Sequence, residues 1–134
     1  MPFVLDASVA ATWAFEDENH PDAALAPARI RSDAARVPSL WWFELRNALL
    51  VNERRGRLTE AGTAAFPRDL GRLAVSIDRS PDETGVLTLA RRHRLTVHDA
   101  ACLELAQREG LSLASLDGAL RDAATASGVP LLGA

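Results

Sequence analysis

The sequence predicts an α/β protein: a three-layer α/β/α sandwich with a mostly parallel central sheet. Short apolar runs alternate with longer amphipathic stretches along the 134 residues, and this alternation is typical of a parallel sheet covered by helices. The chain is 48% hydrophobic and 25% charged, which is ordinary for a globular protein. Its length suits one compact unit, so we expect residues 1–134 to form a single domain.

The first half of the chain begins with the apolar run FVL over residues 3–5, directly before Asp6. Such a run is typical of a short buried strand. Pro21 suits the first turn of a helix, Pro38 stops a strand, and Gly56 marks a helix end. We therefore expect, in order, helices over 7–15 and 21–32, a strand over 35–37, and a helix over 41–54.

The second half continues the alternation. A helix is expected to start at Thr59, with Glu60 in its first turn, and Pro67 is expected to interrupt or end it. The remaining expected elements are a strand over 73–77, helices over 81–93 and 97–109, a strand over 111–116, a helix over 117–126 and a last strand over 129–132.

Composition excludes several classes of protein. Cys102 is the one cysteine, so an internal disulfide is impossible and we expect a reducing, cytoplasmic environment. All fifteen basic residues are arginine, which excludes P-loop ATPases and Schiff-base enzymes because both need a lysine. No apolar run approaches the length of a membrane span, and the start of the chain does not resemble a signal peptide.

Three aspartates stand at strand-to-helix or loop-to-helix junctions, and ligands of parallel α/β sheets bind beyond the carboxyl ends of the strands. Asp6 and Asp117 each follow an expected strand, and Asp99 opens an expected helix. Each has an alternative interpretation as a helix cap. Glu44 lies in the apolar helix over 41–54, which we expect to be largely buried, and Asn47 shares its face. The alternative for Glu44 is an ion pair with an arginine.

If these four carboxylates converge, their mutual repulsion requires protons or cations. A pair of like charges 4 Å apart costs about 4 kcal/mol at an effective dielectric constant of 20. Oxygen ligands favour the hard cations Mg²⁺ and Mn²⁺. The residues therefore predict a divalent-metal site at the carboxyl ends of the strands.

Four blocks of the sequence, in this order and spacing, resemble the PIN-domain ribonucleases, specifically the VapC toxins of type II toxin–antitoxin systems. They are FVLDASVAATWAFEDE, VPSLWWFELRNALL, LTVHDAACLELAQREGLSLASLD and VPLL. The resemblance implies a metal-dependent endoribonuclease that hydrolyses RNA phosphodiester bonds with water activated by Mg²⁺ or Mn²⁺. The family's four acids map onto Asp6, Glu44, Asp99 and Asp117. Supporting positions map onto Ser8, Asn47 and Ser115.

The sequence departs from the family pattern at two positions. His98 stands where the family commonly has tyrosine, and Cys102 where an aromatic residue is frequent. We interpret His98 as a packing or supporting residue rather than a general acid, and Cys102 as a small core residue.

The chain carries a net charge of −3, so RNA would be held by local basic patches. The densest run contains Arg91 and Arg92 and a second contains Arg54 and Arg55; both can equally be solvated helix ends. The resemblance further implies a cognate antitoxin and a homodimer, without membrane association. A non-catalytic PIN-like binding module and a DNA nuclease are the competing hypotheses.

Overall fold

The computed structural model describes residues 1–14, 33–70 and 74–132, and it contains a four-stranded sheet in the order β3-β2-β1-β4. All three strand pairs are parallel. The strands are β1 (Phe3–Leu5), β2 (Ala35–Pro38), β3 (Val75–Asp78) and β4 (Ser112–Ala114). Leu5 pairs with Ala114, so the residues that follow them, Asp6 and Ser115, emerge side by side at the carboxyl edge of the sheet.

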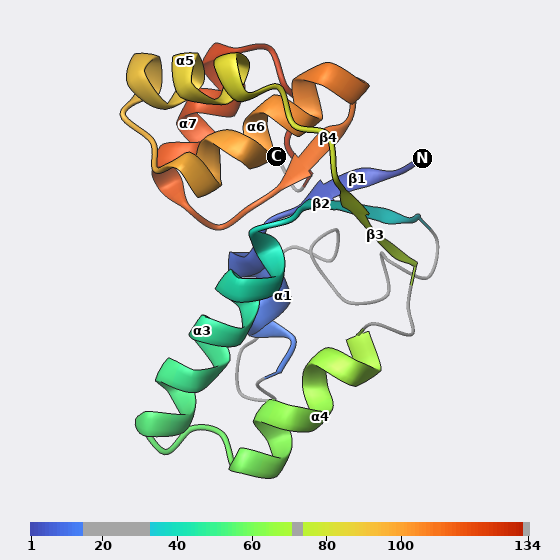
Figure 1. Ribbon diagram of the computed structural model, residues 1–134, viewed down its shortest axis with the longest axis vertical. Helices are drawn as coiled ribbons and strands as arrows, with labels where there is room; N and C mark the ends of the chain where they lie inside the picture. The colour runs from blue at the N-terminus through green and yellow to red at the C-terminus, as the bar shows by residue number, and fades with distance from the viewer. Residues whose placement is uncertain (15–32, 71–73, 133–134) are drawn as a thin grey trace.

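Six helices of the described chain cover the two faces of this sheet (Figure 1). One face carries α5 (Glu83–His93), α6 (Val97–Glu109) and α7 (Gly118–Ala126), and the other carries α1 (Ala7–Thr12), α3 (Trp41–Arg54) and α4 (Glu60–Leu70). The predicted three-layer α/β/α sandwich with a parallel sheet is therefore confirmed.

Each face of the sheet has its own hydrophobic core, and β1 contributes to both. Val4 packs in the core beneath α5, α6 and α7, whereas Phe3 and Leu5 pack against α1 and α3. Side chains alternate between the faces of a strand. This explains why FVL is apolar throughout: both of its faces are buried.

Helices α3 and α6 have the bounds that the sequence predicted. Thr96 caps α6, because its Oγ1 accepts a hydrogen bond from the Asp99 N–H at 3.2 Å. Gly110 ends the helix with a φ of 67°, a conformation that favours glycine. Helix α1 is shorter than predicted and ends at Thr12, since the Trp13 N–H bonds to the Ala10 carbonyl in a tighter turn.

Other predicted bounds differ by a few residues. Strand β4 covers less than the predicted 111–116, and the last predicted strand, 129–132, contributes one isolated bridge between Leu113 and Leu131. The helix predicted over 21–32 lies outside the described residues. Among those residues, no helix has both the length and the apolar character to cross a membrane.

The prediction that Pro67 interrupts or ends α4 is wrong. The helix continues past it to Leu70. Proline removes one backbone donor, but Phe66 and Leu70 pack on the core against α3, so burial offsets the lost hydrogen bond.

The expectation that α3 is largely buried is also wrong. Trp41, Leu45 and Leu49 are buried, in a stripe with a spacing of four residues. Trp42 is 46% exposed and Phe43 66% exposed. Only one side of α3 faces the sheet, and mean hydropathy does not reveal how many sides of a helix are covered.

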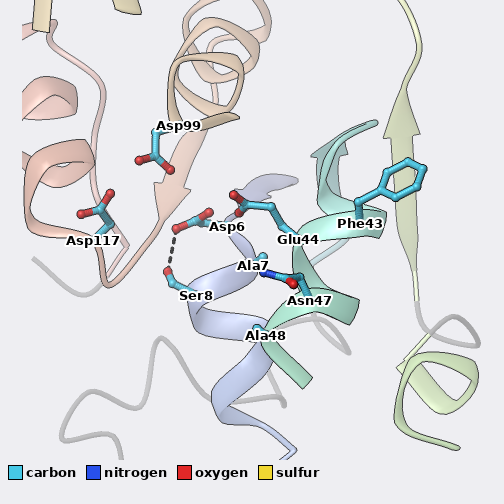
Figure 2. Close-up of a pocket in the computed structure, with 9 residues that line it drawn as sticks. All are labelled: Asp6, Ala7, Ser8, Phe43, Glu44, Asn47, Ala48, Asp99 and Asp117. Atoms are coloured by element: carbon cyan, nitrogen blue, oxygen red, sulfur yellow. Dashed lines mark hydrogen bonds between the residues drawn. The ribbon is translucent and has the colours of Figure 1, made fainter. Parts of the chain in front are cut away.

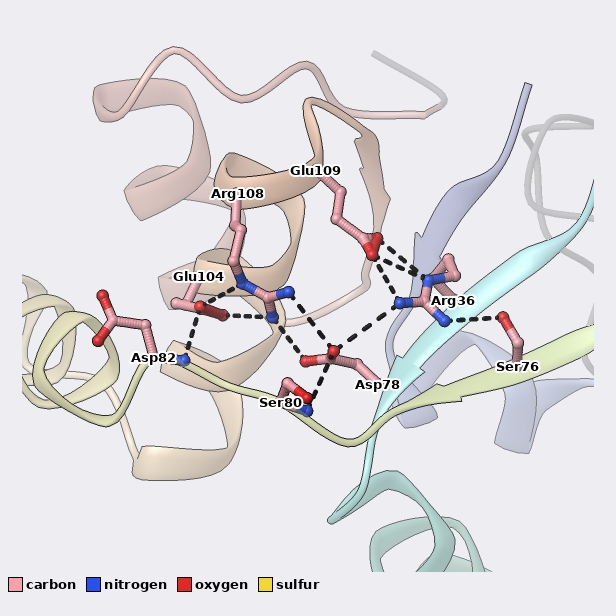
Figure 3. Close-up of polar contacts among 8 residues, drawn as sticks. All are labelled: Arg36, Ser76, Asp78, Ser80, Asp82, Glu104, Arg108 and Glu109. Carbon is pink, nitrogen blue, oxygen red and sulfur yellow. Dashed lines mark hydrogen bonds and ion pairs between the residues drawn. The ribbon is translucent and has the colours of Figure 1, made fainter.

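An ion-pair network joins the far end of α6 to β2 and β3 (Figure 3). The buried carboxylates of Asp78 and Glu104 both accept hydrogen bonds from Arg108, at 2.6 Å from Nη2 and 2.7 Å from Nε. These bonds raise the pKa of Arg108, with Glu104 contributing most. Arg36 of β2 bonds Glu109 at 2.6 Å. The carboxyl-terminal half of α6 is thus tied to the sheet edge.

We predict that Arg108→Ala lowers the free energy of unfolding by about 3 kcal/mol, because buried Glu104 would lose its counter-charge and buried Asp78 would keep only its longer contact with Arg36, at 3.8 Å. Arg36→Ala is the matched control. It leaves the 2.6 Å pair of Asp78 with Arg108 intact, removes the 3.8 Å contact of Arg36 with Asp78 and unpairs the partly exposed Glu109, so about 1 kcal/mol or less is expected. Denaturant unfolding at pH 7 measures both. If the two variants lose the same free energy of unfolding, the buried ion pairs of Arg108 contribute no more than the exposed ion pair of Arg36.

Candidate active site

A cavity of about 450 Å³ opens at the carboxyl edge of the sheet (Figure 2). All four predicted acids line it, together with Ser8 and Asn47. The full lining is Asp6, Ala7, Ser8, Phe43, Glu44, Asn47, Ala48, Asp99 and Asp117. The structure thus brings together residues that are up to 111 positions apart in the chain, from Asp6 to Asp117. Their catalytic role stays a prediction.

Asp6 directly follows β1 and is only 2% exposed. Its Oδ2 accepts two hydrogen bonds, from Ser8 Oγ at 2.6 Å and from Ser115 Oγ at 2.8 Å. The two hydroxyls are themselves fixed: Ser8 Oγ accepts from the Leu116 N–H and Ser115 Oγ from the Asp117 N–H, both at 3.0 Å. Asp6 occupies the N-cap position of α1, as the capping interpretation predicted, but its side chain makes no capping hydrogen bond.

The capping interpretation holds for Asp117 and fails for Asp99. Asp117 is the N-cap of α7, and its Oδ1 accepts a hydrogen bond from the Ala119 N–H at 3.3 Å. Asp99 lies in the first turn of α6, where Thr96 provides the cap instead. Both carboxylates therefore lie at the amino-terminal end of a helix, and both also line the cavity.

Glu44 is exposed on α3 and, among the described residues, forms no ion pair with an arginine, so that alternative is wrong. Its Oε2 lies 2.7 Å from His98 Nε2, but the approach is off the N–H direction and makes no directional hydrogen bond. Burial lowers the pKa of His98, although the charge of Asp6 opposes this. The ring is therefore neutral near pH 7, and the contact is not an ion pair.

The clustered charge changes the protonation of two acids. Burial raises the pKa of Asp99 to about 7, helped by a hydrogen bond with Asp117 and by the charges of Asp6, Asp117 and Glu44. Burial likewise raises the pKa of Glu44 to about 7, with contributions from Asp6 and Asp117. No basic side chain is among the described residues that line the cavity. The negative charge is left for protons or cations to neutralise.

Cys102 and His98 lie beneath the cavity and do not line it. Both are buried, as predicted. The Cys102 thiol points at Asp6, with 4.0 Å between Sγ and Oδ1. Burial raises the pKa of this thiol, and the charge of Asp6 adds to the effect. Both residues depart from the family pattern in the sequence, but their approach to Asp6 was not predicted.

Phe43, Ala7 and Ala48 also line the cavity and were not predicted. Ala48 lies four residues after Glu44, and Phe43 lies four residues before Asn47. Residues four apart share a face of a helix, so this spacing could have predicted both positions. Neither Arg91 nor Arg92 lines this cavity. Arg92 contributes instead to a separate cleft with Glu104 and Arg108.

The chain is an α/β protein with a parallel sheet, and acidic side chains gather beyond the carboxyl ends of its strands. Residues 3–126 match the family model described as the PIN domain. The chain is therefore a member of the PIN-domain family, as the sequence blocks predicted. A search of the curated proteins finds no match.

Three solved structures share the fold. PAE2754 from Pyrobaculum aerophilum is 22% identical, with a TM-score of 0.73 over 92% of this chain and 84% of that one. FitAcB from Neisseria gonorrhoeae is 16% identical, with a TM-score of 0.62 over 98% and 96%. VapC20 from Mycobacterium tuberculosis, a sarcin–ricin loop cleaving toxin, is 14% identical, with a TM-score of 0.59 over 90% and 94%.

We predict that, in buffer with chelator, the protein loses stability as the pH rises from about 4 to about 7. The pKa values of Asp99 and Glu44 rise on folding from ordinary values of 3.8 and 4.5 to about 7. Between those limits these two carboxyl groups hold more protons in the folded chain than in the unfolded chain, so their contribution to stability falls with increasing pH. The lowered pKa of His98 acts in the opposite direction below pH 6.5, but it is one group against two.

The matched variants are Asp99→Asn and Asp122→Asn, the second an exposed position on α7. At pH 8, Asp99→Asn should gain about 1–2 kcal/mol after discounting for partial solvent exposure, and its pH profile should be flatter. Asp122→Asn should follow the parent profile. Denaturant unfolding from pH 4 to 8 measures this, and identical slopes for all three proteins would show that Asp99 is not perturbed.

Proposed function

We propose that this chain is a divalent-metal-dependent endoribonuclease and acts as the toxin of a type II toxin–antitoxin system. One observation carries the proposal: four carboxylates line a single cavity that has no basic residue in its described lining, in a chain that belongs to the PIN-domain family. The fold shared with VapC20, a toxin that cleaves the sarcin–ricin loop, supports the same reading.

The donor set of the cavity fits a hard cation, Mg²⁺ or Mn²⁺. Its charged donors are carboxylate oxygens from Asp6, Glu44, Asp99 and Asp117, and hard cations prefer oxygen ligands. About 450 Å³ leaves room for an ion together with water, as Mg²⁺ usually retains several waters. When bound, such an ion would activate water and neutralise charge on the phosphate.

The protein's own residues prepare this site before any substrate arrives. Two hydroxyls hold Oδ2 of Asp6, so this carboxylate needs no reorganisation. Asp117 is fixed by its capping bond to α7. Asn47, exposed on the same face of α3 as Glu44, offers an amide N–H₂ for a phosphate oxygen.

The rim of the cavity suits a single-stranded nucleic acid. Phe43 lines the cavity and is 66% exposed, and its ring contacts that of Trp42 edge to face with centroids 5.1 Å apart. Exposed aromatic rings of this kind stack on bases that are not paired. This feature favours RNA loops over duplex DNA as the substrate.

We predict that Asp99→Asn reduces Mn²⁺-dependent cleavage of RNA at least about hundredfold, because it removes one of the carboxylates that would hold the cation. Asp122→Asn should cleave like the parent protein. Gel-based cleavage of RNA and DNA, with Mn²⁺ and with chelator, measures this.

In the parent protein Mn²⁺ should also stabilise the fold, by about 2.7 kcal/mol at a hundredfold excess over Kd.

Each competing function has its own result in these assays. Stabilisation by Mn²⁺ and RNA binding without cleavage would identify a binding module. Preferential cleavage of DNA would identify a DNA nuclease. Full cleavage by Asp99→Asn, or cleavage that persists in chelator, would contradict the proposed acidic metal site.

The proposal includes a cognate antitoxin, a homodimer and a cytoplasmic location. The resemblance to the VapC toxins supports the antitoxin and the homodimer. Exposed Trp42 and Phe43 beside the cavity supply apolar surface that a protein partner can cover. The single, buried cysteine suits a reducing compartment.

We further propose that Arg91 and Arg92, both exposed in the last turn of α5, contact RNA phosphates. The double variant Arg91→Glu/Arg92→Glu should weaken RNA binding across all sequences and reduce the slope of log K against log salt by about 2. Arg54→Glu/Arg55→Glu, with the same change of charge at the end of α3, is the control. If both double variants weaken RNA binding equally, Arg91 and Arg92 make no specific contact with RNA and are solvated residues at a helix end.

A further inference from the structure

The three side chains of Asp6, His98 and Cys102 converge in the interior, beneath the acidic cavity. Each offers one potential ligand atom, and these atoms lie within 4.8 Å of one another. All three residues are buried, with His98 only 6% exposed and Cys102 not exposed at all. His98 and Cys102 are four residues apart on α6, so they share the helix face that packs against β1.

His98 is the observation that points to a ligand. Neither of its ring nitrogens has a hydrogen-bond partner among the described residues, and the contact of Nε2 with Glu44 is off-axis. Buried polar groups are nearly always satisfied, so an unpartnered imidazole needs an explanation. A neutral imidazole nitrogen is also among the commonest metal ligands in proteins.

The separation of the oxygen and sulfur donors is within the reach of one ion. Zinc bonds oxygen at about 2.0–2.2 Å and sulfur at about 2.3 Å, so two such ligands of one ion can lie at most about 4.3–4.5 Å apart. Asp6 Oδ1 and Cys102 Sγ are 4.0 Å apart. Oδ2 of Asp6 is the oxygen that Ser8 and Ser115 hold, so Oδ1 remains available on the side of the thiol.

We propose that Asp6, His98 and Cys102 form a second cation site, selective for a thiophilic divalent ion of the Zn²⁺ class. The mixed oxygen, nitrogen and sulfur donor set favours Zn²⁺ over Mg²⁺. On binding, the Cys102 thiol loses its proton to solvent and coordinates as the thiolate. Three protein ligands leave a fourth position for water or for the neighbouring carboxylate of Glu44.

Asp6 belongs to both sites, because it also lines the acidic cavity. Occupancy of the buried site therefore changes the affinity of the cavity for its own cation, and the coupling is reciprocal. This consequence rests on the proposed function, whereas the buried site itself does not.

The test is binding of metal alone to the full chain, with the cysteine kept reduced. Zn²⁺ should bind with high affinity at one ion per chain in calorimetry, and any binding in the acidic cavity should be weaker. Co²⁺ should produce a thiolate-to-cobalt charge-transfer absorption in the near ultraviolet, and Cys102 is the sole thiol that can give it. Cys102→Ala should abolish this absorption, and Cys102→Ala and His98→Phe should each weaken Zn²⁺ binding at least about tenfold.

Two matched controls separate this site from the others. His93→Gln removes a histidine outside the cluster and should leave the Zn²⁺ affinity and the cobalt spectrum unchanged. Asp117→Asn removes a cavity acid but none of the three ligands, so it should keep the cobalt spectrum even when RNA cleavage is lost. Failure of the proposed function would thus leave the metal-binding result intact.

Three results would overturn the proposal: a parent protein with no charge-transfer absorption, Zn²⁺ affinity unchanged in Cys102→Ala, or Mg²⁺ competing with Zn²⁺ at equal concentration. Circular dichroism establishes that each variant is folded. Should both Cys102→Ala and Cys102→Ser fail to fold, the cobalt spectrum of the parent protein decides the question.

Discussion

The pairing of β1 with β4 is the interaction on which the candidate site depends. Leu5 lies beside Ala114 in this parallel register, and the Asp6 N–H donates to the Ala114 carbonyl at 2.9 Å. The chain then turns into α1 on one strand and toward α7 on the other. As a result Ser115 reaches Oδ2 of Asp6 from a position 109 residues away in the sequence. A shift of one residue would turn these side chains to opposite faces of the sheet.

Concentrating negative charge at one edge of the sheet has a free-energy cost that the rest of the fold must offset. Helix α6 presents Asp99 at its amino-terminal end, and it is buried along most of its length. This burial offsets part of the cost. Its other end is held by Arg108, which neutralises two buried carboxylates. The same helix therefore has charges paired with arginine at its carboxyl-terminal end and an acid without a basic partner beside the cavity at its amino-terminal end. Such a separation is typical of functional sites.

Asp6 connects two chemically different environments. Its Oδ2 is fixed by hydroxyl groups next to an open cavity lined by carboxylates. Its Oδ1 faces the buried interior, which contains a thiol and an imidazole without a hydrogen-bond partner among the described residues. Hard cations prefer the first environment and thiophilic cations the second. His98 and Cys102, the two residues that depart from the VapC pattern, both lie close to the Asp6 carboxylate.

The sequence by itself determined the fold class and the positions of Asp6 and Asp117, because apolar runs identify parallel strands and the carboxyl ends of such strands share one edge. It did not determine the surroundings of Glu44. Hydropathy suggested a buried helix, and only the packing of α3 against α1 showed that one side of it stays open beside the cavity. The approach of His98 and Cys102 to Asp6 was likewise decided by tertiary structure. Helical spacing places the first two on one face, but contact with a residue more than ninety positions away depends on how α6 packs against the sheet.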